Sequence, residues 1–224
     1  MQLQGQVGIQ QNNDGVPNAG RTGRTGEWIV SELQGRFYEN CLRNNLYSIG
    51  GAQTALSANT ISLVAATTPI VGVWNPSTSS VNLVILQGGV TIVGTSATAV
   101  GQGALVWASS LGNIAISTGS APFSRKTMSA AGSQAKGFAL ANATALTGLT
   151  NNLVVFDSCD VGGLGFTVTS NTNIGGMMAG VHNFDGGLIV PPGGVLALLN
   201  TTSTTTVSAA ARLLWAEIPL TIGQ

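Results

Sequence analysis

The sequence predicts an all-β protein, a jelly-roll-like β-sandwich with an extended N-terminal arm and one short helix. Three observations favour this class. From Ile49 onward, short runs rich in Val, Ile and Leu alternate with clusters of Gly, Ser, Thr and Asn, a spacing typical of a sandwich or jelly roll. Several of these runs are apolar on both faces. Charged residues make up only 7% of the chain, whereas they are about 25% of an ordinary globular domain.

Residues 1–26 form the predicted arm. They are rich in Gln, Asn and Gly, show no helix or strand periodicity, and hold too few apolar residues to build a core. In an isolated chain we expect a disordered tail, which is the usual state of such a terminus. In an assembly we expect the arm to become ordered against a neighbouring subunit. The candidate contact residues are Gln10, Asn13, Val16, Arg21, Arg24 and Trp28.

Residues 27–47 are the one segment whose pattern favours a helix. Apolar residues recur at steps of three to five from Trp28 to Leu42, and two acid–base pairs stand four residues apart. Thr25 would cap the start of this helix. Gly35 weakens the pattern, and the run at 28–30 would alternatively begin a strand. We interpret the segment as a short helix or linker that packs against the sandwich or a partner.

Residues 48–224 form the predicted sandwich domain, with about ten to twelve strands at the expected spacing. The runs at 187–190 and 195–200 are expected to form a hairpin, with Pro191-Pro192-Gly193-Gly194 as its turn. A second, longer hairpin is expected around the turn at 75–80, and a long loop at 119–137. The expected strands are 60–65, 70–74, 81–86, 90–93, 104–108, 114–117, 138–141, 153–156, 165–169, 187–190, 195–200 and 207–218.

The strand at 81–86 needs protein on both of its faces. Val81, Leu83 and Ile85 point to one face, and Val84 and Leu86 point to the other. A neutral strand of this kind at an open sheet edge would pair with other chains. The whole stretch 44–124 has no Asp, Glu, Lys or Arg, and the net charge of the chain is zero, which favours association. We therefore expect an assembled protein whose contacts are screened little by salt.

One charged residue stands in the otherwise apolar run at 207–216. In this run Arg212 is surrounded by Ala, Leu and Trp. A charge in such a place is expected to be paired. We expect a structural ion pair between Arg212 and an acid, either Glu217 or a carboxylate of a neighbouring subunit.

Few residues suggest catalysis or metal binding. The one histidine, His182, stands three residues before Asp185, but no serine lies in a Gly-x-Ser-x-Gly elbow. Asp157 and Asp160 would bind calcium with His182 or Asp185 only if their loops converge. A carboxylate pair for glycan cleavage would need two of Asp157, Asp160, Asp185 and Glu217 to face one cleft. We expect no enzyme activity, no metal and no cofactor.

The composition also bears on partners and location. Only the segments 21–24 and 125–126 approach a basic patch, so we expect no nucleic-acid binding. No apolar run reaches the roughly 18 to 20 residues that cross a bilayer, and the N-terminus lacks the apolar core of a signal peptide. These features predict synthesis in a reducing cytosol and no membrane partner. Cys41 and Cys159 are expected to be buried thiols, although a disulfide stays open.

Four blocks of the sequence, taken in order, resemble a group of small structural proteins of tailed bacteriophages. Proteins of this group decorate or cement the phage head as jelly-roll or β-sandwich trimers. The resemblance covers most of the chain and is one of pattern and order. The blocks are Gly23-Arg24-Thr25-Gly26-Glu27 through Gly35-Arg36-Phe37-Tyr38-Glu39, Trp74-Asn75-Pro76, Pro191-Pro192-Gly193-Gly194, and Leu214-Trp215-Ala216-Glu217-Ile218-Pro219.

The resemblance implies a capsid decoration protein. Such a protein binds the major capsid protein as a homo-oligomer, here expected to be a trimer, and stabilises the head at the capsid surface of the virion. The arm would then contact the capsid protein or a neighbouring subunit, and no catalytic residues transfer. One alternative is a head-fibre or tail component with a carbohydrate-binding sandwich, and others are a shell-forming coat protein and a glycan hydrolase. A carbohydrate-binding sandwich would stack sugars on Trp28, Trp74, Trp107 or Trp215.

Overall fold

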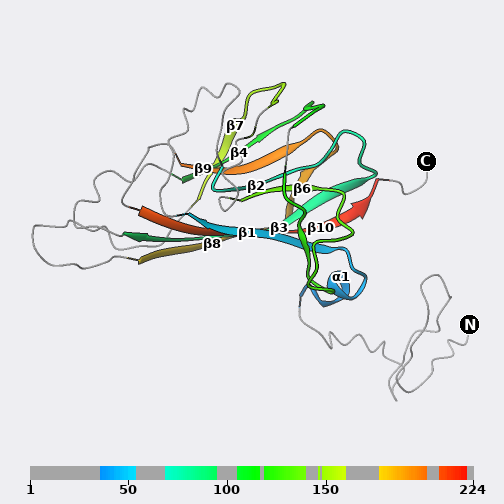
Figure 1. The fold of residues 1–224 in the computed structure, drawn as a ribbon, viewed down its shortest axis with the longest axis horizontal. Helices are drawn as coiled ribbons and strands as arrows, with labels where there is room; N and C mark the ends of the chain where they lie inside the picture. Colours follow the sequence, from blue (N-terminus) through cyan, green and yellow to red (C-terminus); the bar gives the residue numbers. More distant parts are fainter. Residues whose placement is uncertain are drawn as a thin grey trace, which may run out of the picture. The chain divides into compact units, whose positions relative to one another are not determined.

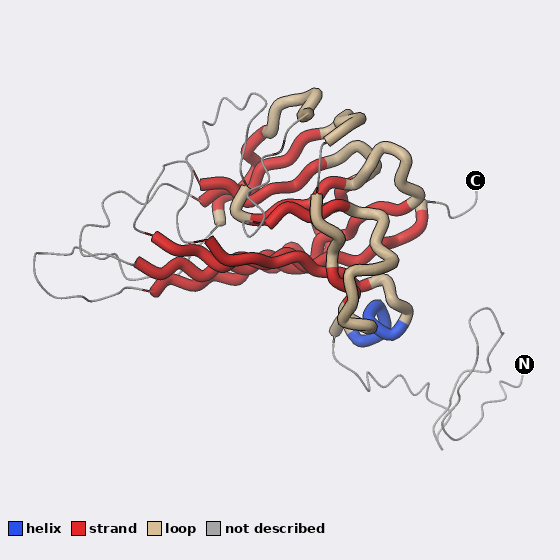
Figure 2. The backbone as a smooth tube through the Cα atoms, viewed as in Figure 1, coloured by secondary structure: helices blue, strands red, loops and turns tan. Residues whose placement is uncertain are grey.

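The computed structural model describes residues 36–53, 69–94, 105–116, 119–139, 146, 148–159, 177–200 and 207–220. The chain divides into two compact units, Met1–Glu39 and Asn40–Gln224. The described part of the second unit contains two five-stranded sheets that pack face to face (Figures 1 and 2). This arrangement confirms the predicted all-β sandwich.

Neighbouring strands are antiparallel in both sheets. The first sheet contains, in spatial order, β5 (Phe123–Ser124), β1 (Leu46–Gln53), β10 (Val207–Pro219), β3 (Val81–Gly94) and β8 (Met177–Val190). The second sheet contains β6 (Lys136–Ala139), β2 (Val71–Trp74), β9 (Val195–Asn200), β4 (Leu105–Ser110) and β7 (Val154–Ser158).

Eight of these strands follow the order of a jelly roll. Without β5 and β6, the first sheet reads β1-β10-β3-β8 and the second reads β2-β9-β4-β7. The chain changes sheets at every connection among these eight strands except the one from β4 to β7. This alternation winds the chain around the core as two Greek keys do. β5 and β6 fall within the exceptional connection and extend one edge of each sheet.

The two predicted hairpins are wrong, because the strands of each pair lie in different sheets. β2 belongs to the second sheet and β3 to the first, and β8 and β9 are likewise separated. The turns were placed correctly: Pro192 and Gly193 occupy the centre of a type II turn, with φ of +79° at Gly193 and a 2.8 Å bond from Gly194 N to Pro191 O. Local sequence predicts a turn but does not say whether the strands on either side pair.

Asn75 holds these two turns together at one corner of the sandwich. Its backbone N donates to Gly194 O at 2.9 Å, and its backbone O accepts from Gly193 N at 2.8 Å. Its buried Nδ2 donates to Val81 O at 2.8 Å and to Val190 O at 3.0 Å. One side chain therefore bonds the start of β3 and the end of β8, and its backbone bonds the β8–β9 turn.

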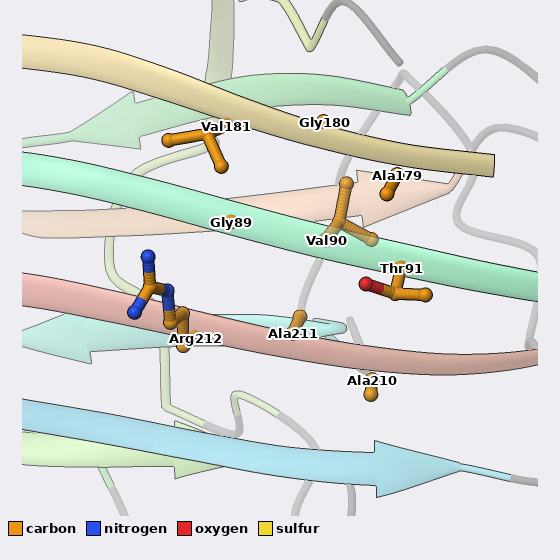
Figure 3. Close-up of a pocket in the computed structure, with 9 residues that line it drawn as sticks. All are labelled: Gly89, Val90, Thr91, Ala179, Gly180, Val181, Ala210, Ala211 and Arg212. Carbon is orange, nitrogen blue, oxygen red and sulfur yellow. The ribbon is translucent and has the colours of Figure 1, made fainter. Parts of the chain in front are cut away.

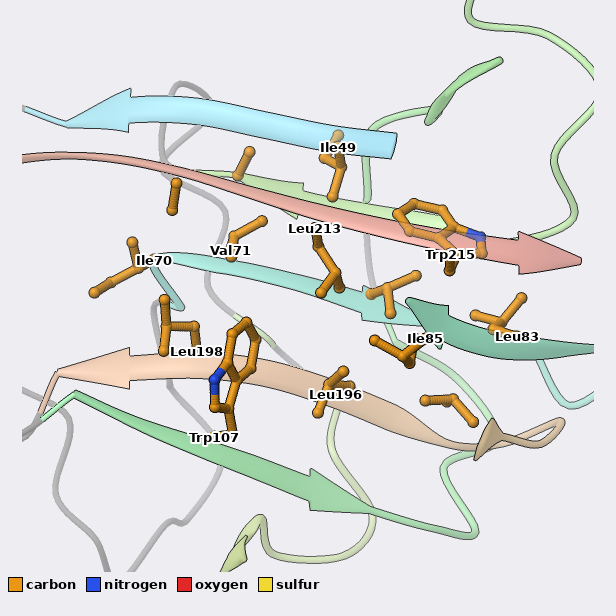
Figure 4. Close-up of a cluster of buried hydrophobic side chains, with 14 of the residues drawn as sticks. Ile49, Ile70, Val71, Leu83, Ile85, Trp107, Leu196, Leu198, Leu213 and Trp215 are labelled. Atoms are coloured by element: carbon orange, nitrogen blue, oxygen red, sulfur yellow. The ribbon is translucent and has the colours of Figure 1, made fainter. Parts of the chain in front are cut away.

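The main core lies between the two sheets. Its largest side chains include Trp107 from the second sheet and Trp215 from the first, both fully buried (Figure 4). A second apolar cluster includes Trp74, Phe138 and Leu146. Alternate residues of β9 contribute to the two clusters, so every residue of this strand is buried. Cover on both faces was predicted for the strand at 81–86, where Val81, Leu83, Ile85 and Leu86 are buried and Val84 is half-buried.

The helical segment ends earlier than predicted. The helix α1 spans Tyr38–Leu42, and β1 begins at Leu46, so the predicted end at residue 47 is wrong. Asn44 stops the helix because it adopts the left-handed conformation, with φ of +60°. Bonds from Asn44 N to Cys41 O and from Asn45 N to Asn40 O complete a Schellman motif. Residues 27–35 lie outside the described residues.

Other strand predictions need smaller corrections. The runs at 81–86 and 90–93 form the single strand β3, and 187–190 is only the end of β8. The described residues of 114–117 form no strand, and the predicted loop at 119–137 contains β5 and the start of β6. The predicted strands at 60–65 and 165–169 lie outside the described residues.

Two remaining predictions concern the cysteines and the membrane. Cys159 is buried, Cys41 is half-buried, and the two are not joined in a disulfide. Within the described ranges, no helix is long and apolar enough to cross a bilayer.

Candidate functional site

The candidate site lies on the face of the first sheet that points away from the core, which we call the outer face. Strand periodicity determines which side chains reach it. In β10, Ala211, Leu213 and Trp215 are buried in the core, whereas Ala210 and Arg212 are exposed on the other side. Around Arg212, the outer face of β10, β3 and β8 carries the neutral residues Gly89, Thr91, Ala179, Val181 and Ala210.

The side chain of Arg212 is held in a defined position. A Cβ atom on Gly89 would lie 3.1 Å from Nε and 3.2 Å from Cγ of Arg212, so the arginine lies where a larger residue would stand. Nη2 of Arg212 donates to Gln87 Oε1 at 2.7 Å. Nε2 of Gln87 in turn donates to Asn183 Oδ1 at 2.8 Å. This chain of contacts runs across β10, β3 and β8 and fixes the guanidinium above the sheet.

Arg212 borders two hollows on the outer face. One has a volume of about 350 Å³, and Figure 3 shows Gly89, Ala179, Val181 and Ala210 around it with Arg212 at one end. The other hollow, of about 190 Å³, is lined by residues of β1 and β10 and by Arg125. Among the described residues that line the two hollows, none is acidic. Both hollows are therefore suited to a neutral or anionic partner.

The predicted ion pair between Arg212 and Glu217 is wrong. The two residues are five positions apart on one strand, so their side chains point to opposite faces. Glu217 is buried, with 6% of its surface exposed. It accepts a bond from Ser133 Oγ at 2.5 Å and one from Gln134 N at 3.1 Å. Through these hydrogen bonds, Glu217 connects the loop before β6 to the end of β10.

Glu217 also affects a neighbouring phenol. Tyr47 is 3% exposed and follows the first residue of β1. Burial raises the pKa of Tyr47 above its ordinary value of 10.0, and the negative charge of Glu217 raises it further. Both effects disfavour the tyrosinate in the folded chain.

The residues considered for catalysis and metal binding come together only in part. His182 Nε2 lies 3.2 Å from Asp157 Oδ2, and this contact links β8 to β7 across the two sheets. The ring of His182 also contacts Phe184, with a centroid distance of 4.4 Å. Asp185 is exposed, three residues further along β8. The described residues therefore bring His182 and Asp157 together, and Asp160 lies outside the described residues.

A metal site would need more ligands than this pair. Among the described residues, no group of three or more His, Cys, Asp or Glu side chains could hold a metal ion. All six predicted contact residues of the arm, Gln10, Asn13, Val16, Arg21, Arg24 and Trp28, lie outside the described residues.

The adjacent glycines Gly88 and Gly89 were missed by the sequence analysis. A Cβ on Gly88 would lie 2.4 Å from Cζ2 of Trp107, and one on Gly89 would contact Arg212. One glycine therefore makes room for the core tryptophan, and the next makes room for the surface arginine. The available signal was a Gly-Gly pair inside a β-rich run, which often marks a close approach to the backbone.

The fold and the outer face define the class of this protein as a jelly-roll β-sandwich with a sparsely charged sheet face. Comparison of the chain with protein-family models, with curated proteins and with solved structures finds no match in any of the three.

Proposed function

We propose that this chain is a virion structural protein, a decoration protein that binds the major capsid protein shell of a bacteriophage head and stabilises it. The observation that carries the proposal is the outer face, on which Arg212 stands among small and neutral residues of β10, β3 and β8. Charged residues are depleted at the centres of protein interfaces, where arginine is enriched. The jelly roll is also a fold that viral capsid domains use.

Exposed apolar side chains on β8 support a role in contact with other proteins. The exposed fraction is 55% for Val181 and 53% for Ile189. β8 is an edge strand of the first sheet over its described residues. A long edge strand with so few charges would aggregate if left open, so native proteins cover such edges. We propose that other copies of this chain, in a trimer, supply part of this cover.

The proposed mechanism is adhesion, without enzyme activity. Each covered contact stabilises the particle through burial of apolar surface, at about 25 cal/mol per Å². The cost of ordering the arm and the interface side chains is subtracted from this gain. Because the contacts are repeated over a closed shell, modest individual affinities become strong collectively.

The direct test is to add the purified chain to phage heads assembled without it. We expect the chain to sediment with the heads at a fixed number of copies and to raise the temperature at which the heads break open. A chain that stays in the supernatant would refute the proposed function.

The arm can be tested with a deletion of residues 1–26. Because the sandwich contains its own core, we expect the shortened chain to keep its β-rich circular dichroism spectrum while its occupancy on heads falls to background. Occupancy equal to that of the full chain would remove the arm from the mechanism.

The carbohydrate-binding alternative loses most of its proposed stacking platform. Trp74, Trp107 and Trp215 are all buried and contribute to the two apolar clusters. A sugar-stacking tryptophan needs an exposed ring face. Trp28 lies outside the described residues. Binding to a glycan array in the absence of binding to heads would favour this alternative.

A further inference from the structure

We infer that Arg212 receives a carboxylate of the capsid protein, and that the two hollows beside it form one docking site. The partner would be a segment of the shell that carries an Asp or Glu side chain between small apolar residues. This inference rests on the proposed function, because it names the chemistry of the partner at the outer face.

The charge of the two hollows favours an acidic occupant. Arg212 borders both hollows, and Arg125 lines the smaller one. None of the described lining residues is acidic, so neither hollow contains a carboxylate of its own. The backbone N of Arg125 donates to Leu46 O at 2.9 Å, which ties the arginine to β1. A carboxylate in the smaller hollow would therefore lie near two arginines, both of which line it.

Arg212 is also held in position before any partner binds. Its stem lies over Gly89, and the hydrogen bond to Gln87 holds one end of the guanidinium. A guanidinium has five N–H donors, and this hydrogen bond uses one of them. Prior fixation reduces the side-chain entropy that is lost when a partner binds.

The residues around the arginine have small side chains or none. Gly89, Ala179 and Ala210 let a partner backbone come close to the sheet (Figure 3). A partner that covers these residues would exclude water from the Arg212–carboxylate pair. Arginines that are covered in this way at the centre of an interface are common hot spots.

The test compares Arg212→Gln with Lys136→Gln, using heads assembled without the chain as the probe. Lys136 is exposed on β6, in the second sheet, so its substitution removes the same charge away from the outer face. We expect Arg212→Gln to weaken binding to heads at least about tenfold, as truncation of a covered charge pair does. We expect Lys136→Gln to bind as the wild type does. Circular dichroism and sedimentation would show that both variants are folded and have the wild-type mass.

A second variant, Arg212→Lys, keeps the charge but loses the planar fork that matches a carboxylate. We expect its affinity to fall between those of the wild type and Arg212→Gln.

Equal binding by wild type and Arg212→Gln would overturn the inference and leave the proposed function intact. A change of oligomeric mass in Arg212→Gln would also overturn it, because a second copy of the chain would then be the occupant. Arg212-dependent binding to an array of acidic glycans would also overturn the inference, because a glycan would then be the occupant. Failure of the wild type to bind heads would instead refute the proposed function itself.

Discussion

At the scale of single residues, the faces of β10 explain which sequence inferences failed. Arg212 and Glu217 were expected to pair because both are charged and close in sequence. An odd separation on a strand places them on opposite faces, so one contacts Gln87 and the other contacts Ser133. The His182–Asp157 contact joins residues of two different sheets. Strand periodicity predicts that Arg212 and Glu217 lie on opposite faces. The His182–Asp157 contact depends on how the two sheets pack, which no local sequence pattern contains.

Tyr47 gives a prediction about alkaline pH. Its pKa is raised in the folded chain by burial and by Glu217. Above about pH 10 the unfolded tyrosine loses its proton while the folded one keeps it, so the unfolded state binds fewer protons and stability falls as pH rises. Tyr47 therefore lowers the free energy of unfolding by up to about 1.4 kcal/mol per pH unit. This decline runs from the pKa of Tyr47 in the unfolded chain up to its pKa in the folded chain.

The measurement is the free energy of unfolding in denaturant between pH 9 and pH 11. We expect Tyr47→Phe to show a shallower alkaline decline than the wild type. The matched control is Tyr38→Phe, because Tyr38 is the other tyrosine and is 43% exposed. Identical slopes in the wild type and Tyr47→Phe would contradict the role given to burial and Glu217.

At the scale of elements, the turns were predictable and the strand pairing was not. Residues 75–80 and the Pro-Pro-Gly-Gly segment have the composition of tight turns, and both are turns. A hairpin and a crossing between two sheets use similar turn residues, so composition does not distinguish them. The burial of β9 on both faces follows from its sequence, because apolar residues fill consecutive positions and do not alternate with polar ones.

Asn75 gives a prediction at this scale. Asn75→Ala removes two bonds from a buried amide to Val81 O and Val190 O, and it leaves those carbonyls without that donor. Loss of such bonds at a buried site is expected to lower the free energy of unfolding by about 2 to 4 kcal/mol.

The measurement is the denaturant midpoint, with an unchanged slope of the unfolding transition. Ser77→Ala is the matched control, because Ser77 is an exposed residue of the same turn. If the two variants shift the midpoint equally, Asn75 does not hold the corner.

At the scale of the whole molecule, the fold class was predictable from alternating runs and turn clusters, because every jelly-roll strand must bury at least one face. The strand order was not predictable, since it depends on contacts between residues far apart in sequence. The sparse charge of the chain favours association, which stays a prediction. The sequence singled out Arg212 as the one charge in its run, but it did not indicate that β10 lies in the middle of the first sheet.

Sparse charge leads to a prediction about assembly. Contacts made by apolar and neutral polar groups have little long-range electrostatic energy, and covered charge pairs are screened much less than exposed ones. We therefore expect the mass of the assembled chain to be the same in about 0.05 M and about 1 M salt, where the Debye length changes severalfold. Sedimentation velocity measures this mass, and dissociation at high salt would show that exposed ionic contacts hold the assembly.

The glycine pair in β3 makes the sheet locally as thin as its own backbone. At residues 88 and 89, one peptide unit separates the indole of Trp107 in the interior from the stem of Arg212 outside. No side-chain layer lies there to absorb movement. We therefore expect a molecule that displaces the arginine to disturb the indole ring as well, because only the β3 backbone lies between them.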